Sequence, residues 1–431
     1  MSRIFNLRII KIFFITSLVI FCSLHVLKQK PIEYQQGMGW DGRYYFAAYN
    51  VFKGKGAEIL PAVDGHVTNF EFVKKGFPFN QRWGIPFLAS LLPFSAAVSF
   101  KVIDLLFFAA GSFLLFFKWA KDAKQYLLPL MLITWLIVLP LCPFRGALFY
   151  PFNVDGAQYL YLALLLLTWK NINYVSLITI LFLPFKESAL IFYIIYVICS
   201  IVIFYIAEQN SSSRYNSIKY ISRNLLFTGI TLFSFFVYRK ILLHNGMELG
   251  SSFHTIIEWV NVRLFDPEFY VRLLVSIFFA YGYFLFIFLE NVKLASVIKD
   301  THFLFFLLLF LILPFTGSDL TRIVGSLLPV LFDMIVKFSK RRPVNLGKII
   351  LAIILFLPLT NPVHILWFNQ DSKIGEGIFE FTGEWASISR VMIIFIYGTV
   401  CCYFLNINAT EKMLQKINSV LLGSKNEYYK K

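Results

Sequence analysis

The chain has 431 residues, of which 58% are hydrophobic, 19% aromatic and 15% charged, and its formal net charge is +16. One soluble core cannot bury that much apolar surface, so the composition excludes an ordinary soluble protein. The basic residues lie between apolar stretches rather than on one face of a soluble fold. This argues against nucleic acid as a partner and favours membrane lipids and lipid phosphates.

The N-terminal segment resembles a signal peptide, because Arg3, Arg8 and Lys11 precede an apolar run. No small-residue cleavage site follows, so we expect an uncleaved first span. Apolar stretches near the length of a spanning helix recur to the C-terminus, and they predict an all-α polytopic membrane protein with about 10–12 transmembrane helices. The whole chain, 1–431, is expected to form one membrane-embedded domain. The candidate spans are 10–27, 102–118, 126–142, 155–169, 174–185, 188–207, 225–243, 271–291, 302–316, 323–336, 348–366 and 388–406.

The sequence does not determine whether two of the apolar stretches cross the membrane. The 174–207 stretch is compatible with one bent helix, two half-spanning helices, or a re-entrant pair broken near Pro184. The 84–97 stretch contains Pro86 and Pro93, and we expect it to lie at the membrane interface rather than cross.

The distribution of basic residues sets the expected orientation. With the N-terminus in the cytoplasm, the short inner loops are strongly basic and the outer loops are close to neutral. The C-terminal tail, 407–431, then returns to the cytoplasm. The first outer loop, 28–101, is by far the longest and carries charges, aromatic residues and short amphipathic pieces, and long loops of this kind are usually functional. The other outer segments are 143–154, the junction near 186, 244–270, 317–322 and 367–387.

The first outer loop contains two candidate functional segments. Trp40-Asp41-Gly42-Arg43-Tyr44-Tyr45 combines a carboxylate that could act as a general base with aromatic rings suited to a sugar, although an interfacial aromatic belt with one loop aspartate would look the same. Arg43 is counted with the substrate-binding candidates. Further on, Arg82 begins an apolar segment, where its guanidinium could bind a phosphate or anchor to lipid headgroups.

Three further candidates lie at other expected outer positions. Asp155 begins a span, where it could bind a ligand or simply cap the helix together with Asn153. Lys186 and Glu187 interrupt a long apolar run, which favours a functional role over a mutually supporting pair in an outer turn. Asp319 and Arg322 share one face of a helical turn, so Arg322 is a second phosphate candidate or half of a local ion pair.

These residues together resemble the GT-C superfamily, the integral-membrane glycosyltransferases that use polyprenyl- or dolichyl-phosphate sugars. The resemblance to bacterial members covers roughly the first half of the chain. It rests on Asp41-Gly42-Arg43-Tyr44-Tyr45, on Arg82 followed by Pro86, and on Lys186-Glu187, with Asp319-x-x-Arg322 further along.

The resemblance implies a GT-C-like helical bundle in the bacterial inner membrane with its active site on the outer side. Asp41 would deprotonate an acceptor hydroxyl of a glycan or lipid. That hydroxyl would attack a polyprenyl-phosphate-linked sugar with inversion. The leaving phosphate would be stabilised by Arg82, Lys186 or Arg322. No cofactor is required by this scheme, no metal-ligand spacing is apparent, and participation of a divalent metal stays open.

Two alternatives remain at this point. A polysaccharide polymerase or ligase would share the lipid-linked donor but usually has large arginine-rich outer loops. The 244–270 loop, with Arg263 and nearby Arg272, matches that pattern only faintly. A lipid or solute transporter would place polar residues through many spans, whereas here they gather on one side.

Overall fold

The computed structural model describes residues 41–61, 66–123, 127–138, 152–208, 214–250, 252–267, 300–315, 320–340 and 344–356, with a few single residues between them. This described part is mostly helical and contains no strand, which confirms the predicted all-α class. Among the described residues, one antiparallel bridge joins Ile59 to Thr68.

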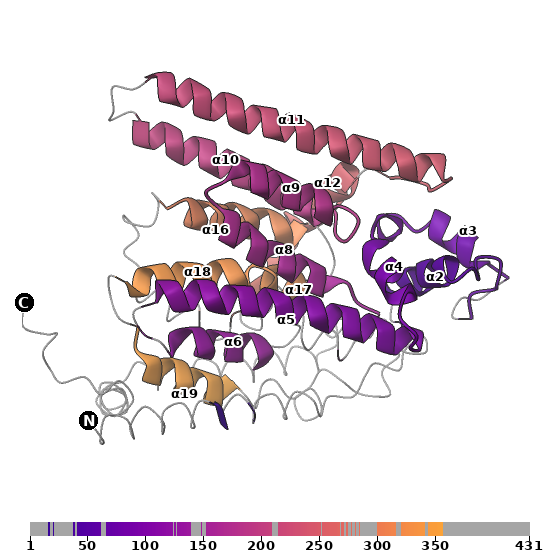
Figure 1. Ribbon diagram of the computed structural model, residues 1–431, viewed down its shortest axis with the longest axis horizontal. Helices are drawn as coiled ribbons and strands as arrows, with labels where there is room; N and C mark the ends of the chain where they lie inside the picture. Colours follow the sequence, from indigo (N-terminus) through magenta and orange to yellow (C-terminus); the bar gives the residue numbers. More distant parts are fainter. Residues whose placement is uncertain are drawn as a thin grey trace, which may run out of the picture.

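Three short helices and one 3-10 turn form the first loop: α2 (Gly42–Phe52), α3 (Asn69–Lys74), η1 (Phe79–Gln81) and α4 (Gly84–Ser90). Figure 1 shows α2, α3 and α4 gathered at one end of the helical bundle, which we call the loop end. The buried Asn69 side chain closes the loop on itself, because its Nδ2 donates to the carbonyl oxygens of Lys55 and Glu58. At the start of α3, Thr68 and Glu71 form a capping box that satisfies free helix amides.

The remaining helices form the bundle, in which the longer helices run side by side (Figure 1). Their bounds are α5 (Ala96–Asp122), α6 (Leu128–Val138), α8 (Asp155–Thr168), α9 (Ile172–Phe182), α10 (Ser188–Glu208), α11 (Arg214–His244), α12 (Ser252–Arg263), α16 (Thr301–Ile312), η2 (Leu313–Phe315), α17 (Leu320–Gly325), α18 (Leu328–Ser339) and α19 (Leu346–Phe356).

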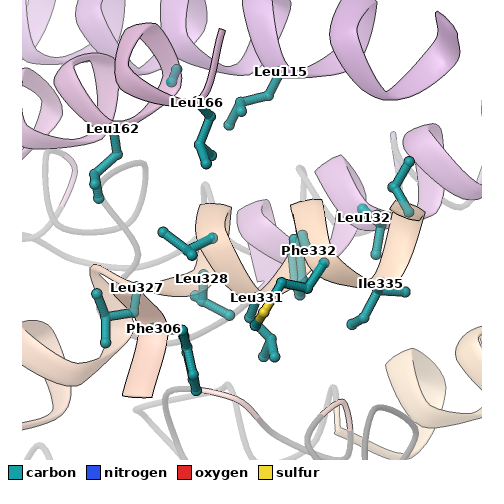
Figure 2. Packing of buried hydrophobic residues seen from close by; sticks show 14 of the residues in the cluster. Leu115, Leu132, Leu162, Leu166, Phe306, Leu327, Leu328, Leu331, Phe332 and Ile335 are labelled. Atoms are coloured by element: carbon teal, nitrogen blue, oxygen red, sulfur yellow. The ribbon is translucent and has the colours of Figure 1, made fainter. Parts of the chain in front are cut away.

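Helix α18 occupies the centre of the core. Nearly all of its side chains are buried, including Asp333. Figure 2 shows its Leu328, Leu331 and Phe332 among side chains from α5, α6, α8 and α16. The bundle therefore has a continuous apolar interior around a single helix.

Three described helices are long and apolar enough to cross a membrane: Ala96–Asp122, Ser188–Ile206 and Ile218–His244. They coincide with the predicted spans 102–118, 188–207 and 225–243. Large apolar side chains stay exposed along them, such as Phe113 and Phe117 on α5 and Phe233 and Phe236 on α11. This is the pattern of helices that face lipid.

The other predicted spans fare differently. The stretches 126–142, 174–185, 302–316 and 348–366 coincide in part with shorter apolar helices. The span 155–169 is the 14-residue α8, and 323–336 is divided between α17 and α18. Two predicted spans lie outside the described residues except for a few single positions: 10–27 and 271–291. The same holds without exception for the span 388–406 and the tail 407–431.

The 174–207 stretch is not one bent helix. Helix α9 ends at Phe182, α10 begins at Ser188, and a turn that includes Pro184 joins them. The 84–97 stretch forms the seven-residue α4, a turn and the start of α5, and the side chains of Phe87, Leu91 and Phe94 are exposed. Its expected place at the membrane interface stays a prediction.

Candidate functional site

The first loop is held against the bundle by contacts at three points. The hydroxyl of Tyr238 on α11 donates to the carbonyl of Gln81, and the Nδ2 of Asn80 donates to the carbonyl of Glu248 over 2.8 Å. The amide of Gly84 donates to the carbonyl of Pro184 over 2.8 Å. These bonds place the Arg82 segment directly beside the turn between α9 and α10.

Asp41 lies at the N-cap position of α2 and does not cap it with its side chain. The next residue, Gly42, packs so closely on Phe152 that an added Cβ would lie 2.8 Å from the Phe152 Cβ. Because no larger side chain fits there, the start of α2 is fixed beside the segment that leads into α8. Tyr45 follows Asp41 by one helical turn, and the charge of Asp41 contributes to the raised pKa of the Tyr45 phenol.

Arg82 joins the loop to the α9–α10 turn. Its Nε donates to Glu187 Oε2 over 2.6 Å, its Nη2 donates to Glu187 Oε1, and its Nη1 donates to the Tyr45 hydroxyl oxygen over 2.8 Å. The side chains of Arg82 and Glu187 are only 11% and 17% exposed. A two-point pair of this kind is the strongest geometry available to an arginine and a carboxylate.

The pKa values of these groups follow from that contact. Burial by itself raises the pKa of Glu187, but the charge and hydrogen bonds of Arg82 outweigh it and hold the pKa below its ordinary value. Burial by itself lowers the pKa of Arg82, but the charge and hydrogen bonds of Glu187 outweigh this effect. The pKa of Arg82 therefore lies above its ordinary value. Burial raises the pKa of Tyr45, which keeps its phenol protonated.

A second ion pair lies in the same place. Lys186 Nζ contacts Asp155 Oδ1 at 2.6 Å, and each side chain is 12% exposed. Two backbone amides at the start of α8, those of Val154 and Asp155, donate hydrogen bonds to Asn153 Oδ1. The N-cap position of α8 is Val154 and carries no side-chain cap, so neither Asn153 nor Asp155 is the N-cap residue that the sequence suggested. Asp155 has a charged partner instead.

The adjacent Lys186 and Glu187 thus find distant partners, Asp155 and Arg82, and the alternative in which they mainly support each other is wrong. We call Tyr45, Arg82, Asp155, Lys186 and Glu187 the loop-end cluster. It joins four sequence segments that were singled out independently, and Asp41 precedes its Tyr45 by one helical turn.

The expected sugar-stacking surfaces are not all available. Tyr44 stacks on Phe72 and on Phe79, with ring centroids 4.4 and 4.9 Å apart, so its ring is engaged inside the loop. Tyr45 is buried and holds Arg82. Arg43 is half-buried beside the Phe72 ring. Trp40 and Asp319 lie outside the described residues, as does the side chain of Arg322.

Sequence reasoning missed Asp104, a fully buried aspartate of α5. Its Oδ1 accepts from the amide of Gly156 over 2.7 Å, and it interacts with the charges of Asp155 and Lys186. A carboxylate inside an otherwise apolar predicted span was the available signal.

A second charged cluster lies at the other end of α5. Asp333 of α18 accepts from Lys118 and from the Trp119 indole, and Asp122 pairs with Lys340 at 2.7 Å. We call these residues the far-end cluster. Its basic residues belong to the loops that the sequence places in the cytoplasm.

Within the described residues, no group of three or more His, Cys, Asp or Glu side chains is placed to hold a metal ion. No protein-family model, curated protein or solved structure matches this chain.

Proposed function

We propose that the chain is a polytopic glycosyltransferase of the bacterial inner membrane. It would transfer a sugar from a polyprenyl-phosphate donor to a glycan or lipid acceptor on the outer face. The observation that carries this proposal is the loop-end cluster, which holds Arg82 and Lys186 where the first loop meets the bundle, with its Tyr45 one helical turn from Asp41. The three long apolar helices supply the membrane setting.

The proposed step places a base and two cations on either side of the anomeric carbon. Asp41 takes the proton of the acceptor hydroxyl as its oxygen bonds to that carbon, and the bond between the carbon and the phosphate oxygen breaks. The electron pair leaves with the polyprenyl phosphate, and the anomeric configuration inverts. The growing negative charge on the phosphate is stabilised by the cations, and fixed charges of this kind need no rearrangement during the reaction.

The geometry around Arg82 is compatible with such a role. A guanidinium carries five N–H donors. Among described residues, three of them reach Glu187 and Tyr45, which leaves one N–H on each Nη for a ligand oxygen. A phosphate would thus join the ion pair rather than replace Glu187. The donor must also be lipid-linked, because soluble sugar nucleotides do not reach the outer face.

The test is sugar transfer in membranes supplied with a radiolabelled polyprenyl-phosphate sugar pool. We expect Asp41→Asn to abolish transfer while the protein remains inserted. Glu58→Gln is the matched control, since Glu58 is an exposed acid of the same loop that pairs only with Lys55 among described residues. Equal transfer in the wild type and Asp41→Asn would exclude Asp41 as the base, and no transfer by the wild type with any sugar in the pool would count against the donor class.

A further inference from the structure

Asp104 lies in the first third of α5, and the reaction proposed above does not use it. Its side chain is completely buried. One carboxyl oxygen, Oδ1, accepts from the Gly156 amide over 2.7 Å. The other, Oδ2, is buried without a hydrogen-bond partner in the described part of the chain.

The contact between Asp104 and Gly156 is unusually close. A Cβ added to Gly156 would lie 2.4 Å from the Asp104 carbonyl oxygen and 2.6 Å from its Oδ1. The backbones of α5 and α8 therefore touch at this point, and glycine is required there. Since Asp155 precedes Gly156 in the first turn of α8, the position of Asp104 also sets the position of Asp155 and, through it, of Lys186.

The charges at this point do not balance if both carboxyl groups are ionised. Of the described charged groups, Asp155 and Lys186 act on Asp104. Lys186 touches Asp155, so Asp155 has the better stabilised negative charge. A second buried carboxylate beside it would be disfavoured both by loss of hydration and by repulsion, and such a group keeps its proton instead.

We infer that Asp104 is a neutral positioning residue. As a carboxylic acid it accepts a hydrogen bond from the Gly156 amide and so fixes the first turn of α8. Lys186 then pairs with the negative charge of Asp155 alone. The loop-end cluster then contains two balanced ion pairs, and Asp104 adds no charge to them. Only the transfer measurement below rests on the proposed function.

Infrared spectroscopy of the full chain in detergent at neutral pH tests the protonation directly. We expect a carbonyl stretching band of a protonated carboxyl group that shifts in D2O, is lost or reduced in Asp104→Asn and is unchanged in the control Glu58→Gln. A wild-type spectrum without this band, or a band that is the same in Asp104→Asn, would overturn the inference. Neither result depends on sugar transfer.

Two substitutions separate the neutral role from an ionic one. Asn is uncharged and keeps a carbonyl oxygen for the Gly156 amide, whereas Leu branches at the same carbon, is larger and has no acceptor. We expect Asp104→Asn to retain sugar transfer and to have a melting temperature close to that of the wild type. Asp104→Leu should lower both the transfer and the melting temperature. If Asn lowers both as strongly as Leu, the negative charge is needed and the inference is wrong. The melting temperatures decide this even if the wild type shows no transfer.

Discussion

Arg82 and Glu187 are 105 residues apart in the sequence and meet in a two-point ion pair, in which Nε donates to Oε2 over 2.6 Å and Nη2 donates to Oε1. One partner comes from the first loop and the other from the turn between two bundle helices. The pair therefore joins two parts of the fold whose sequences do not predict that they touch.

Removing only one partner of this pair should destabilise the protein. Arg82→Met leaves Glu187 buried without its cation, and breaking a buried pair in this way costs about 3–5 kcal/mol. We expect Glu187→Leu to behave similarly and the double variant to recover much of the loss. Thermal unfolding in detergent measures all three. Additive losses in the double variant would show that the two side chains act independently.

Acid should weaken the same pair. The pKa of Glu187 is held below its ordinary value of 4.5, so this group stabilises the fold above that pH. The stabilisation is lost as the pH falls from about 4.5 through the lower pKa of the folded protein, because the proton binds more tightly to the unfolded chain. Melting temperatures measured across this window should fall more steeply for the wild type than for Glu187→Gln. Parallel curves would contradict the assignment.

Gly156→Ala should separate α5 from α8, since its Cβ would lie 2.4 Å from the Asp104 carbonyl oxygen. Overpacking of this kind costs about 1–3 kcal/mol. Gly229→Ala on α11 is the control, because nothing lies within 4 Å of its Cβ and alanine is the better helix former. Unfolding experiments should show a loss of stability for Gly156→Ala and none for Gly229→Ala. Equal behaviour at the two positions would mean that the helices do not approach as closely as described.

The proposed orientation places His66 outside and Lys121 inside, and both residues are exposed. Each can be replaced by cysteine in a background in which the five natural cysteines are removed. A membrane-impermeant maleimide added to intact cells should label His66→Cys and should label Lys121→Cys only after lysis. The opposite pattern would reverse the orientation and move the loop-end cluster to the cytoplasmic side.

Helix content could be predicted from the sequence because long apolar runs need no partner to be recognised. The span 102–118 lies within the observed Ala96–Asp122, and the break near Pro184 was among the stated alternatives. The division of 323–336 into α17 and α18 was not expected, since both pieces are apolar and together have the length of one span.

Site residues were recognised by their chemistry, but their partners were not. Lys186 and Glu187 stand out as charges in an apolar run, and the sequence favoured a functional role for them over a mutual pair. It did not identify Asp155 and Arg82 as their partners. Tyr44 and Tyr45 were expected to face a sugar, and only the packing of Phe72 and Phe79 shows that they support the loop. Contacts across long sequence separations depend on packing, which a single sequence does not display.

Helix α5 is fastened to its neighbours at two levels. Asp104 holds α8 near one end, and Lys118 holds α18 near the other. These two residues are about 21 Å apart along the helix axis, since each residue adds about 1.5 Å. A shift of α5 by one turn along its axis would break both attachments together, so we expect α5, α8 and α18 to stay in fixed positions relative to one another. Any opening wide enough to admit a lipid tail would then come from movement of the other elements relative to these three helices.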